Sequence, residues 1–185
     1  VPLYLFPRGE DFTPYRMYER YDEGRQLMTQ HWPYGEMGMA MQNPYWIINR
    51  NMFNNDRDRY MANAGLKYKV FDWMDISGRV RIDNANTRHT KKLYASTDAK
   101  FAQSKGYYGD RKDVDKQLYA DFLVNINKRF NDFDLTANVG ASIQDVSMDY
   151  VGAEGQLSMI PNFFTLHNVD LGANNSRIKQ DGWKE

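Results

Sequence analysis

Cysteine is absent from this chain, which excludes disulfides, thiolate chemistry and cysteine metal sites. Long apolar runs are absent as well, since 26% of the residues are charged and the mean hydropathy is −0.76. No run approaches the ~18 apolar residues of a transmembrane helix, so helical membrane spans are excluded. Neither sign of charge is in excess, because 24 Lys and Arg balance 24 Asp and Glu. A net charge of zero creates no field that favours nucleic acid, so we expect no nucleic-acid partner.

Catalytic and metal-binding motifs are missing too. The three histidines, His31, His89 and His167, stand apart from one another, without the H-E-x-x-H spacing of a catalytic zinc site. The acidic run Asp110–Asp115 lacks the register and the closing glutamate of a calcium loop. No G-x-x-x-x-G-K-[ST], G-x-G-x-x-G or G-x-S-x-G pattern occurs. We therefore expect no enzymatic activity, no cofactor and no metal.

What the chain does have is alternation with period 2 in two stretches, Tyr60–Ile82 and Leu118–Ile143. In each stretch, apolar and polar residues alternate along two successive runs, which is typical of β-strands with one apolar and one polar face. The two runs are separated by a break, at Phe71–Met74 in the first stretch and at Asn131–Phe133 in the second. Each stretch therefore predicts a long antiparallel β-hairpin.

The length and the connections of these strands favour a membrane protein. Each run has about ten residues or more, compared with about five or six in soluble sheets and roughly 9 to 11 in strands that cross a bilayer. Tight turns close one end of the hairpins, whereas roughly thirty residues or more follow at the other end, as in bacterial outer-membrane barrels. We expect an all-β fold in which antiparallel up-and-down strands, two long hairpins plus long loops, form part of a large transmembrane β-barrel. Periodicity alone fits a soluble β-sandwich equally well.

The barrel interpretation assigns a place to each part of the chain. We expect one partial barrel domain over residues 1–185, with hairpins at 60–83 and 117–144 and external loops at 1–59, 84–116 and 145–185. The membrane-facing side chains would include Leu66, Val80, Phe122, Val124 and Val139. An interfacial aromatic girdle at the tight turns would consist of Phe71, Trp73, Phe130 and Phe133. Two hairpins expose unpaired edges and cannot close, so we expect a segment of a larger barrel.

The expected loops contain the candidate ligand contacts. Residues 84–116 are mildly basic and carry interspersed aromatic residues, and these two kinds of side chain clamp acidic groups and stack on sugars. The candidates for substrate contact are Tyr94, Phe101, Tyr107 and Tyr108. A solvated loop, or one packed on its neighbours, explains the same composition. Residues 1–59 hold five of the six prolines, which predicts an irregular loop. Within this loop we expect Met37–Met41 to pack internally. We expect Asn162–Phe164 to be a packing anchor.

Several short motifs are distinctive and run through the whole chain: Leu5–Gly9, Trp32–Gly35, Asn43–Trp46, Asp58–Met61, Gly78–Asp83, Lys92–Thr97, Ile160–Leu166 and Gln180–Trp183. Together they resemble the barrel of SusC-like (SusC/RagA) TonB-dependent outer-membrane transporters. The resemblance implies a barrel in the cell outer membrane of a Gram-negative bacterium, embedded in outer-membrane lipid. It further implies the import of oligosaccharides or peptides with energy delivered by the TonB complex.

The resemblance also implies partners and missing parts. Many members of this family work with a SusD-like surface lipoprotein that closes over the barrel as a lid, so the candidate substrate residues are candidates for lid contact too. No plug domain and no TonB-contacting segment are found among these residues, and the segment alone is not expected to transport. The alternative function is that of a soluble β-rich module for carbohydrate binding or adhesion, which uses exposed aromatic side chains.

Overall fold

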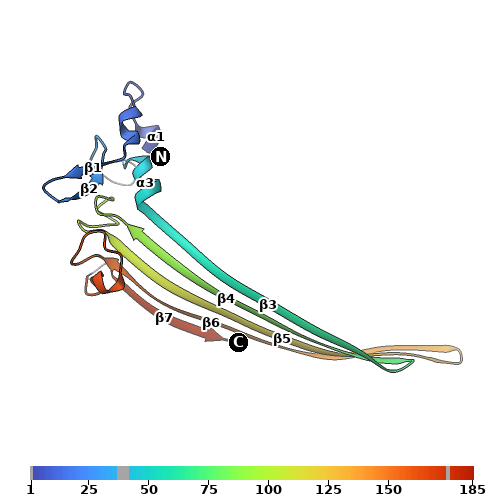
Figure 1. Cartoon of the computed structure of the whole chain (residues 1–185). Helices are drawn as coiled ribbons and strands as arrows, with labels where there is room; N and C mark the ends of the chain where they lie inside the picture. Colours follow the sequence, from blue (N-terminus) through green and yellow to red (C-terminus); the bar gives the residue numbers. More distant parts are fainter. Residues whose placement is uncertain (1, 37–41, 174–175) are drawn as a thin grey trace. The chain divides into compact units, whose positions relative to one another are not determined.

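The computed structural model describes residues 2–36, 42–173 and 176–185. The segment Met37–Met41, which we expected to pack inside its loop, lies outside the described residues. The described chain is mainly antiparallel β-sheet, which confirms the all-β, antiparallel expectation (Figure 1). The strands are β1 (Glu19–Asp22), β2 (Leu27–Gln30), β3 (Asn51–Phe71), β4 (Met74–Leu93), β5 (Tyr107–Phe130), β6 (Phe133–Gln156) and β7 (Arg177–Lys184). The helical elements are short and comprise α1 (Pro2–Leu5), η1 (Thr13–Arg16), α3 (Pro44–Arg50) and η2 (Leu166–Asn168). No helix in the described part of the chain is long and apolar enough to cross a membrane.

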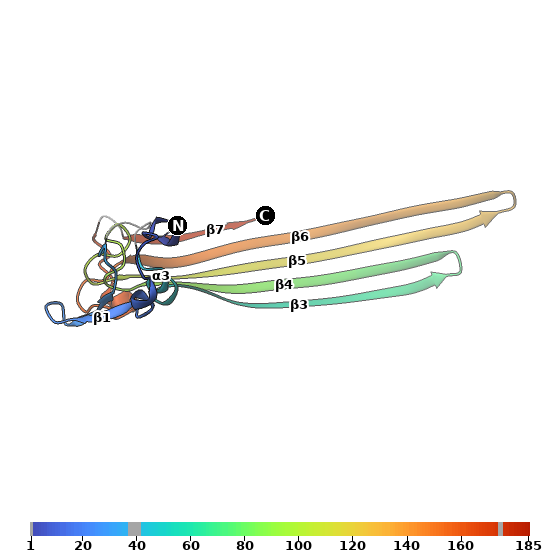
Figure 2. The same cartoon turned by 90° about the horizontal axis from the view of Figure 1, so that it is seen from above.

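Two sheets contain these strands. The larger has five strands in the order β3-β4-β5-β6-β7, so each strand lies beside its neighbour in sequence, and the smaller is the pair β1-β2. Figure 2 shows β3–β4 and β5–β6 side by side, with their turns at the same end. The turns fall at the expected breaks, and Asn131 adopts a φ of 46° in the second turn. Asparagine tolerates this left-handed conformation better than most residues, which suits it to a tight turn.

The strands are longer than the sequence predicted. Strands β3 and β4 extend beyond the expected hairpin 60–83, and β5 and β6 extend beyond 117–144. The expected loop 84–116 therefore shortens to residues 94–106, and the expected loop 145–185 contains the rest of β6 and the whole of β7. The added residues 51–59, 84–93 and 107–116 are mostly polar, and the few apolar residues among them set no regular period. Ladder hydrogen bonds join backbone groups and do not require apolar side chains.

The described chain divides into two compact units. The first unit comprises Val1–Asp56, Arg88–Lys112 and Val151–Gln180, and the second comprises Arg57–Thr87, Asp113–Tyr150 and Asp181–Glu185. The expectation of one partial domain did not anticipate this division. Each unit draws on stretches that are distant in the sequence, because neighbouring strands of an antiparallel sheet run past one another.

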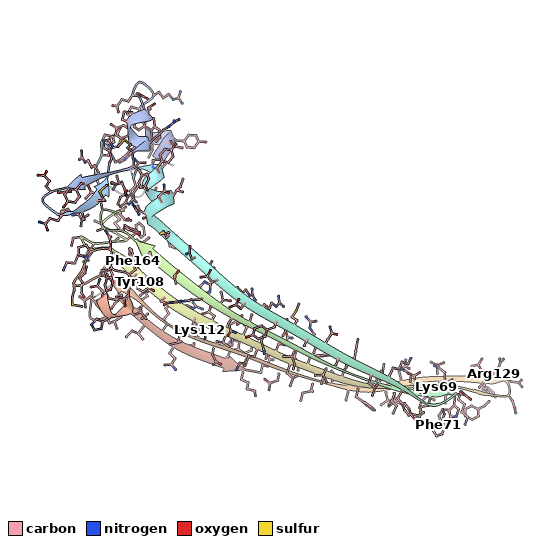
Figure 3. The ribbon with its side chains drawn as sticks, in the orientation of Figure 1. Lys69, Phe71, Tyr108, Lys112, Arg129 and Phe164 are labelled. Carbon is pink, nitrogen blue, oxygen red and sulfur yellow. The ribbon has the colours of Figure 1, made fainter. Side chains whose placement is uncertain are left out.

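The first unit has a packed interior. Trp46, on α3, is fully buried and its indole Nε1 donates a hydrogen bond to Thr97 Oγ1 at 3.0 Å. Helix α3 starts where it does because Asn43 caps it, with its Oδ1 accepting from Tyr45 N at 2.9 Å, and because Pro44 suits the first turn. A second cluster joins residues of distant segments, Tyr108, Leu157 and Val169, with Phe164 packed against it. Figure 3 labels Tyr108 and Phe164, which lie close to one another.

The second unit has almost no hydrophobic interior. Of the described hydrophobic residues that are buried, only Ala85 belongs to it. Large apolar side chains of its strands are instead exposed, for example Leu66 at 75% and Val139 at 65% of their surface. In this unit the described strands form a single sheet, so no second layer covers their apolar face.

Candidate functional site

The strands of the second unit have two chemically distinct faces. Leu66, Val80, Phe122 and Val139 are exposed, whereas Val124 is half-buried. Successive side chains of a strand point to opposite faces, so the polar neighbours of these residues lie on the other side of the sheet. These five residues are the expected membrane-facing set, and the described residues of the unit leave four of them open to the surroundings.

The opposite face is organised by charge. Its cross-strand ion pairs are Arg59–Asp83, Arg79–Asp121 and Lys67–Asp75, with shortest N···O distances of 2.6, 3.0 and 3.2 Å. Asn125 Nδ2 also donates to Asp75 Oδ2 at 2.8 Å, which ties β5 to β4. Solvent reaches the cationic member of each pair and screens the attraction, so the main effect of these pairs is to fix the positions of the charged groups.

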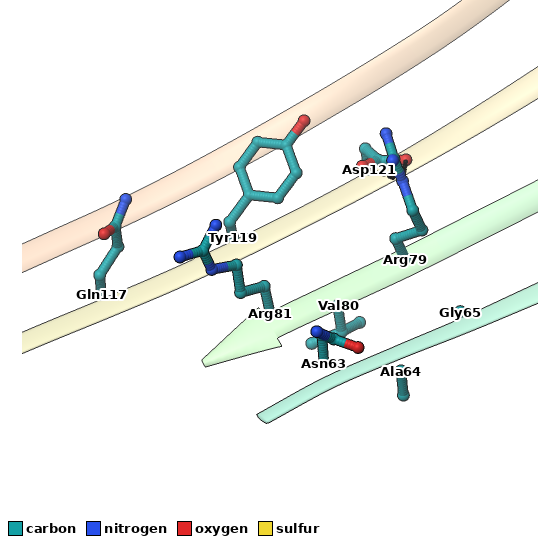
Figure 4. A pocket seen from close by; sticks show the side chains of 9 residues that line it. All are labelled: Asn63, Ala64, Gly65, Arg79, Val80, Arg81, Gln117, Tyr119 and Asp121. Atoms are coloured by element: carbon teal, nitrogen blue, oxygen red, sulfur yellow. Dashed lines mark hydrogen bonds and ion pairs between the residues drawn. The ribbon is translucent and has the colours of Figure 1, made fainter. Parts of the chain in front are cut away.

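A hollow of about 540 Å³ opens on this polar face in the second unit (Figure 4). The residues that line it are Asn63, Ala64, Gly65, Arg79, Val80, Arg81, Gln117, Tyr119 and Asp121. Gly65 has no side chain, and a Cβ there would lie 3.3 Å from Arg79 Cγ, so the missing side chain leaves room beside the arginine. Two guanidinium groups and several neutral hydrogen-bonding groups thus share one open space. Such a set can hold a polar or anionic ligand group.

The tight turns gather aromatic residues around one lysine. The rings of Phe71 and Trp73 stack at 5.2 Å between centroids, and Lys128 Nζ lies 4.5 Å from the Trp73 ring and 5.0 Å from the Phe130 ring. Figure 3 places Phe71 at the turn end of its strand. Phe133, the fourth residue of the expected girdle, is highly exposed. Trp73 and Phe130 therefore make cation–π contacts with Lys128, and Phe71 joins the cluster by stacking on Trp73. The sequence did not reveal Lys128 as the centre of this cluster, because its contact with Trp73 depends on the pairing of distant strands.

Two of the four candidate ligand contacts, Tyr107 and Tyr108, are buried, which corrects the expectation that they contact a ligand. Tyr107 and Tyr108 begin β5 and are each only 6% exposed, so they are interior residues and offer no ring face to a ligand. Burial and the nearby Glu154 carboxylate raise the pKa of Tyr107 well above its usual range. The sequence predicted an exposed loop here because glycine and charged residues flank the two tyrosines. Pairing of β5 with its neighbouring strands instead places both tyrosines in the interior.

The other two candidates remain partly accessible. Phe101 is exposed in the connection between β4 and β5. Tyr94 is half-buried, with its ring 4.8 Å from the Phe164 ring and 4.7 Å from the Arg50 guanidinium carbon. The expectation that Phe164 anchors packing agrees with this contact and with its place beside Tyr108. Of the four candidates, only Phe101 presents an exposed ring.

One ion pair of the first unit perturbs the ionisation of its members. Arg88 Nη2 lies 2.6 Å from Asp110 Oδ2 and Arg88 Nε lies 3.0 Å from Asp110 Oδ1, a two-pronged contact. The hydrogen bond from Arg88 is the main cause that lowers the pKa of Asp110, and the carboxylate in turn raises the pKa of Arg88. The pair joins β4 to β5 and was not predicted, because its members are distant in sequence.

Asn168 is a further structural residue that the sequence did not reveal. Its side chain is buried in η2 and holds the preceding loop by hydrogen bonds to backbone groups of Met159, Ile160 and Phe163. A single asparagine in a loop carries no signal of this role.

Groups of three or more His, Asp or Glu side chains able to hold a metal ion are absent from the described ranges 2–36, 42–173 and 176–185. No protein-family model matches the chain. A search of curated proteins found no significant match.

Proposed function

We propose that this chain forms part of the wall of a large outer-membrane β-barrel that imports oligosaccharides or peptides in the manner of SusC-like TonB-dependent transporters. The single observation that carries the proposal is the exposed apolar face of the second unit, which has almost no hydrophobic interior of its own. Contiguous apolar surface of this kind calls for a partner, and lipid is the partner that suits a sheet face with polar residues behind it.

Lipid cover explains the exposed side chains energetically. Withdrawal of a Val, Leu or Phe side chain from water is worth roughly 1.5–3 kcal/mol. A soluble sandwich would obtain this by packing a second sheet on the same face. The described part of the second unit supplies one sheet only, so the membrane is the better source of cover.

The edges of the sheet point to a larger barrel. Strands β3 and β7 stand at the two edges of the five-stranded sheet. Unpaired backbone N–H and C=O groups cost several kcal/mol each in lipid, so further strands must pair with both edges. The charged face then belongs to the barrel interior, where water or a plug surrounds it.

The import role, the TonB complex and the SusD-like lipoprotein lid follow from the resemblance of the sequence motifs to this transporter class. Among the candidate contacts, Phe101 is the exposed aromatic side chain that fits substrate or lid contact best. The proposed location is the cell outer membrane of a Gram-negative bacterium.

Site-directed spin labels on the complete protein in lipid bilayers test the orientation of the strands. The chain has no cysteine, so each introduced cysteine in it is a unique labelling site. We expect labels on the apolar face to collide with oxygen, which dissolves in lipid, and those on the polar face to avoid it. The apolar positions are Leu66, Val80, Phe122 and Val139, and the matched polar positions are Asn63, Arg79, Asn125 and Asn138. Protection of the apolar set from lipid and water alike would contradict the barrel and favour the soluble module.

A further inference from the structure

The hollow on the polar face of the second unit carries an excess of positive charge. Arg79 and Arg81 line it, and Asp121 is the only acidic residue of the lining, so one positive charge is in excess. The side chains of Arg79 and Arg81 remain 73% and 57% exposed. The hollow therefore presents two accessible guanidinium groups, with one carboxylate to balance them (Figure 4).

The hydrogen-bonding capacity of these arginines is largely unused. Arg79 contacts Asp121 through Nε, at 3.0 and 3.2 Å from the two carboxylate oxygens. Arg81 has weaker contacts, since its Nη2 lies 3.7 Å from Asp83 Oδ2 and 3.8 Å from Met61 Sδ. Asp83 is already held by Arg59 at 2.6 and 2.8 Å. The guanidinium fork of Arg81 is therefore available to an incoming group that can accept two hydrogen bonds.

Neutral groups surround the arginines and add selectivity. The side chains of Asn63, Gln117 and Tyr119 line the hollow, and in the described part of the chain none of the three makes a side-chain hydrogen bond. Each can donate a hydrogen bond to an oxygen, through an amide N–H or a phenolic O–H.

We propose that this hollow binds an oxyanion, a carboxylate, sulfate or phosphate group carried by a molecule that passes through the barrel interior. Charge-assisted bonds from a planar guanidinium to such a group are about twice as strong as neutral ones and are often two-pronged. A cationic group is disfavoured by the net positive charge. A neutral sugar alone would leave Arg81 with only its long contact to Asp83, which Arg59 already holds. The inference rests on the proposed barrel, and it narrows the expected cargo to molecules with an acidic group.

Calorimetric titration of the complete protein, embedded in phosphatidylcholine nanodiscs at low ionic strength, tests this site. The probes are glucuronate and sulfate, with glucose as the neutral counterpart. We expect saturable binding of both anions, weakening as salt is added because screening acts on an exposed site. Arg81→Gln should weaken anion binding about ten-fold or more, and Arg81→Lys should retain part of it. Arg129→Gln is the control, because it removes another exposed arginine, which lies at the turn and outside the hollow, and it should leave the affinity unchanged.

Each alternative outcome has a definite meaning. Absence of anion binding to the wild-type protein would overturn the proposal, and would fit a hollow already filled by a carboxylate from elsewhere in the barrel. Equal weakening by Arg81→Gln and Arg129→Gln, or glucose binding as tight as glucuronate, would overturn it as well. The spin-label test separates failure of the barrel from failure of this site, since lipid contact at Leu66 without anion binding rejects the site alone.

Discussion

Replacement of Asn168 by alanine should strongly destabilise the loop that precedes Asn168, although the substitution removes only a few atoms. The side chain is only 1% exposed. Its Oδ1 accepts from Met159 N and Ile160 N at 2.9 and 3.0 Å, and its Nδ2 donates to Ile160 O and Phe163 O at 2.7 and 2.9 Å. One side chain thus satisfies four backbone groups, and alanine satisfies none of them.

The cost can be worked from these four bonds. A net contribution of roughly 0.5–1.5 kcal/mol for each gives about 2–6 kcal/mol for the local opening of the loop. Asn168→Asp keeps both acceptor contacts but turns a carboxylate oxygen toward the carbonyl oxygens of Ile160 and Phe163, so it should cost at least as much as Asn168→Ala at a pH where the carboxylate is ionised. The order of the two variants separates lost hydrogen bonds from a simple loss of volume, because loss of volume alone would make Asn168→Ala the more costly of the two.

Amide hydrogen exchange measures this opening directly. Because about 1.4 kcal/mol corresponds to a factor of ten, the lower bound of the estimate predicts exchange at Met159 and Ile160 that is roughly thirty times faster in Asn168→Ala. His167→Ala changes the exposed neighbour in the same helix and serves as the control. Exchange at Met159 and Ile160 as slow in Asn168→Ala as in the wild type would refute the reasoning.

Two further predictions concern the membrane face and the pH response. Val80→Arg should destabilise the complete barrel by about 2–4 kcal/mol if that side chain lies near mid-membrane, whereas Asn138→Arg on the polar face should have a mild effect. Folding into lipid vesicles measures the free-energy cost of both substitutions. Equal costs would reject the assignment of the two faces. Since the Arg88 hydrogen bond lowers the pKa of Asp110, the stability from this pair is complete above the ordinary value of 3.8 and is lost as the pH falls through the lower pKa of the folded state. Unfolding monitored against pH should show this acid loss in the wild type and a flatter profile in Arg88→Gln; identical profiles would rule out the pair as its source.

The turns and the faces of the long strands were predictable because both depend on local patterns. Alternation with period 2 is a property of a single strand, so Leu66 and Val80 could be assigned to an apolar face before any pairing was known. The break at Phe71–Met74 interrupts that alternation and marks the turn. The ends of the strands were not predictable in the same way, because residues 51–59 and 84–93 are mostly polar and have no regular apolar period, whereas ladder pairing needs only backbone groups.

The sequence by itself determined that this protein is built from long antiparallel strands with one apolar and one polar side. Only the tertiary structure decided which aromatic residues are interior, as for Tyr108 packed against Phe164, and which charges meet, as for Arg88 and Asp110. It also decided that Arg79 and Arg81 share one open hollow. The physical reason is that the direction of a side chain within a strand is local. Burial, ion pairing and the shape of a hollow arise only when strand pairing brings distant segments together.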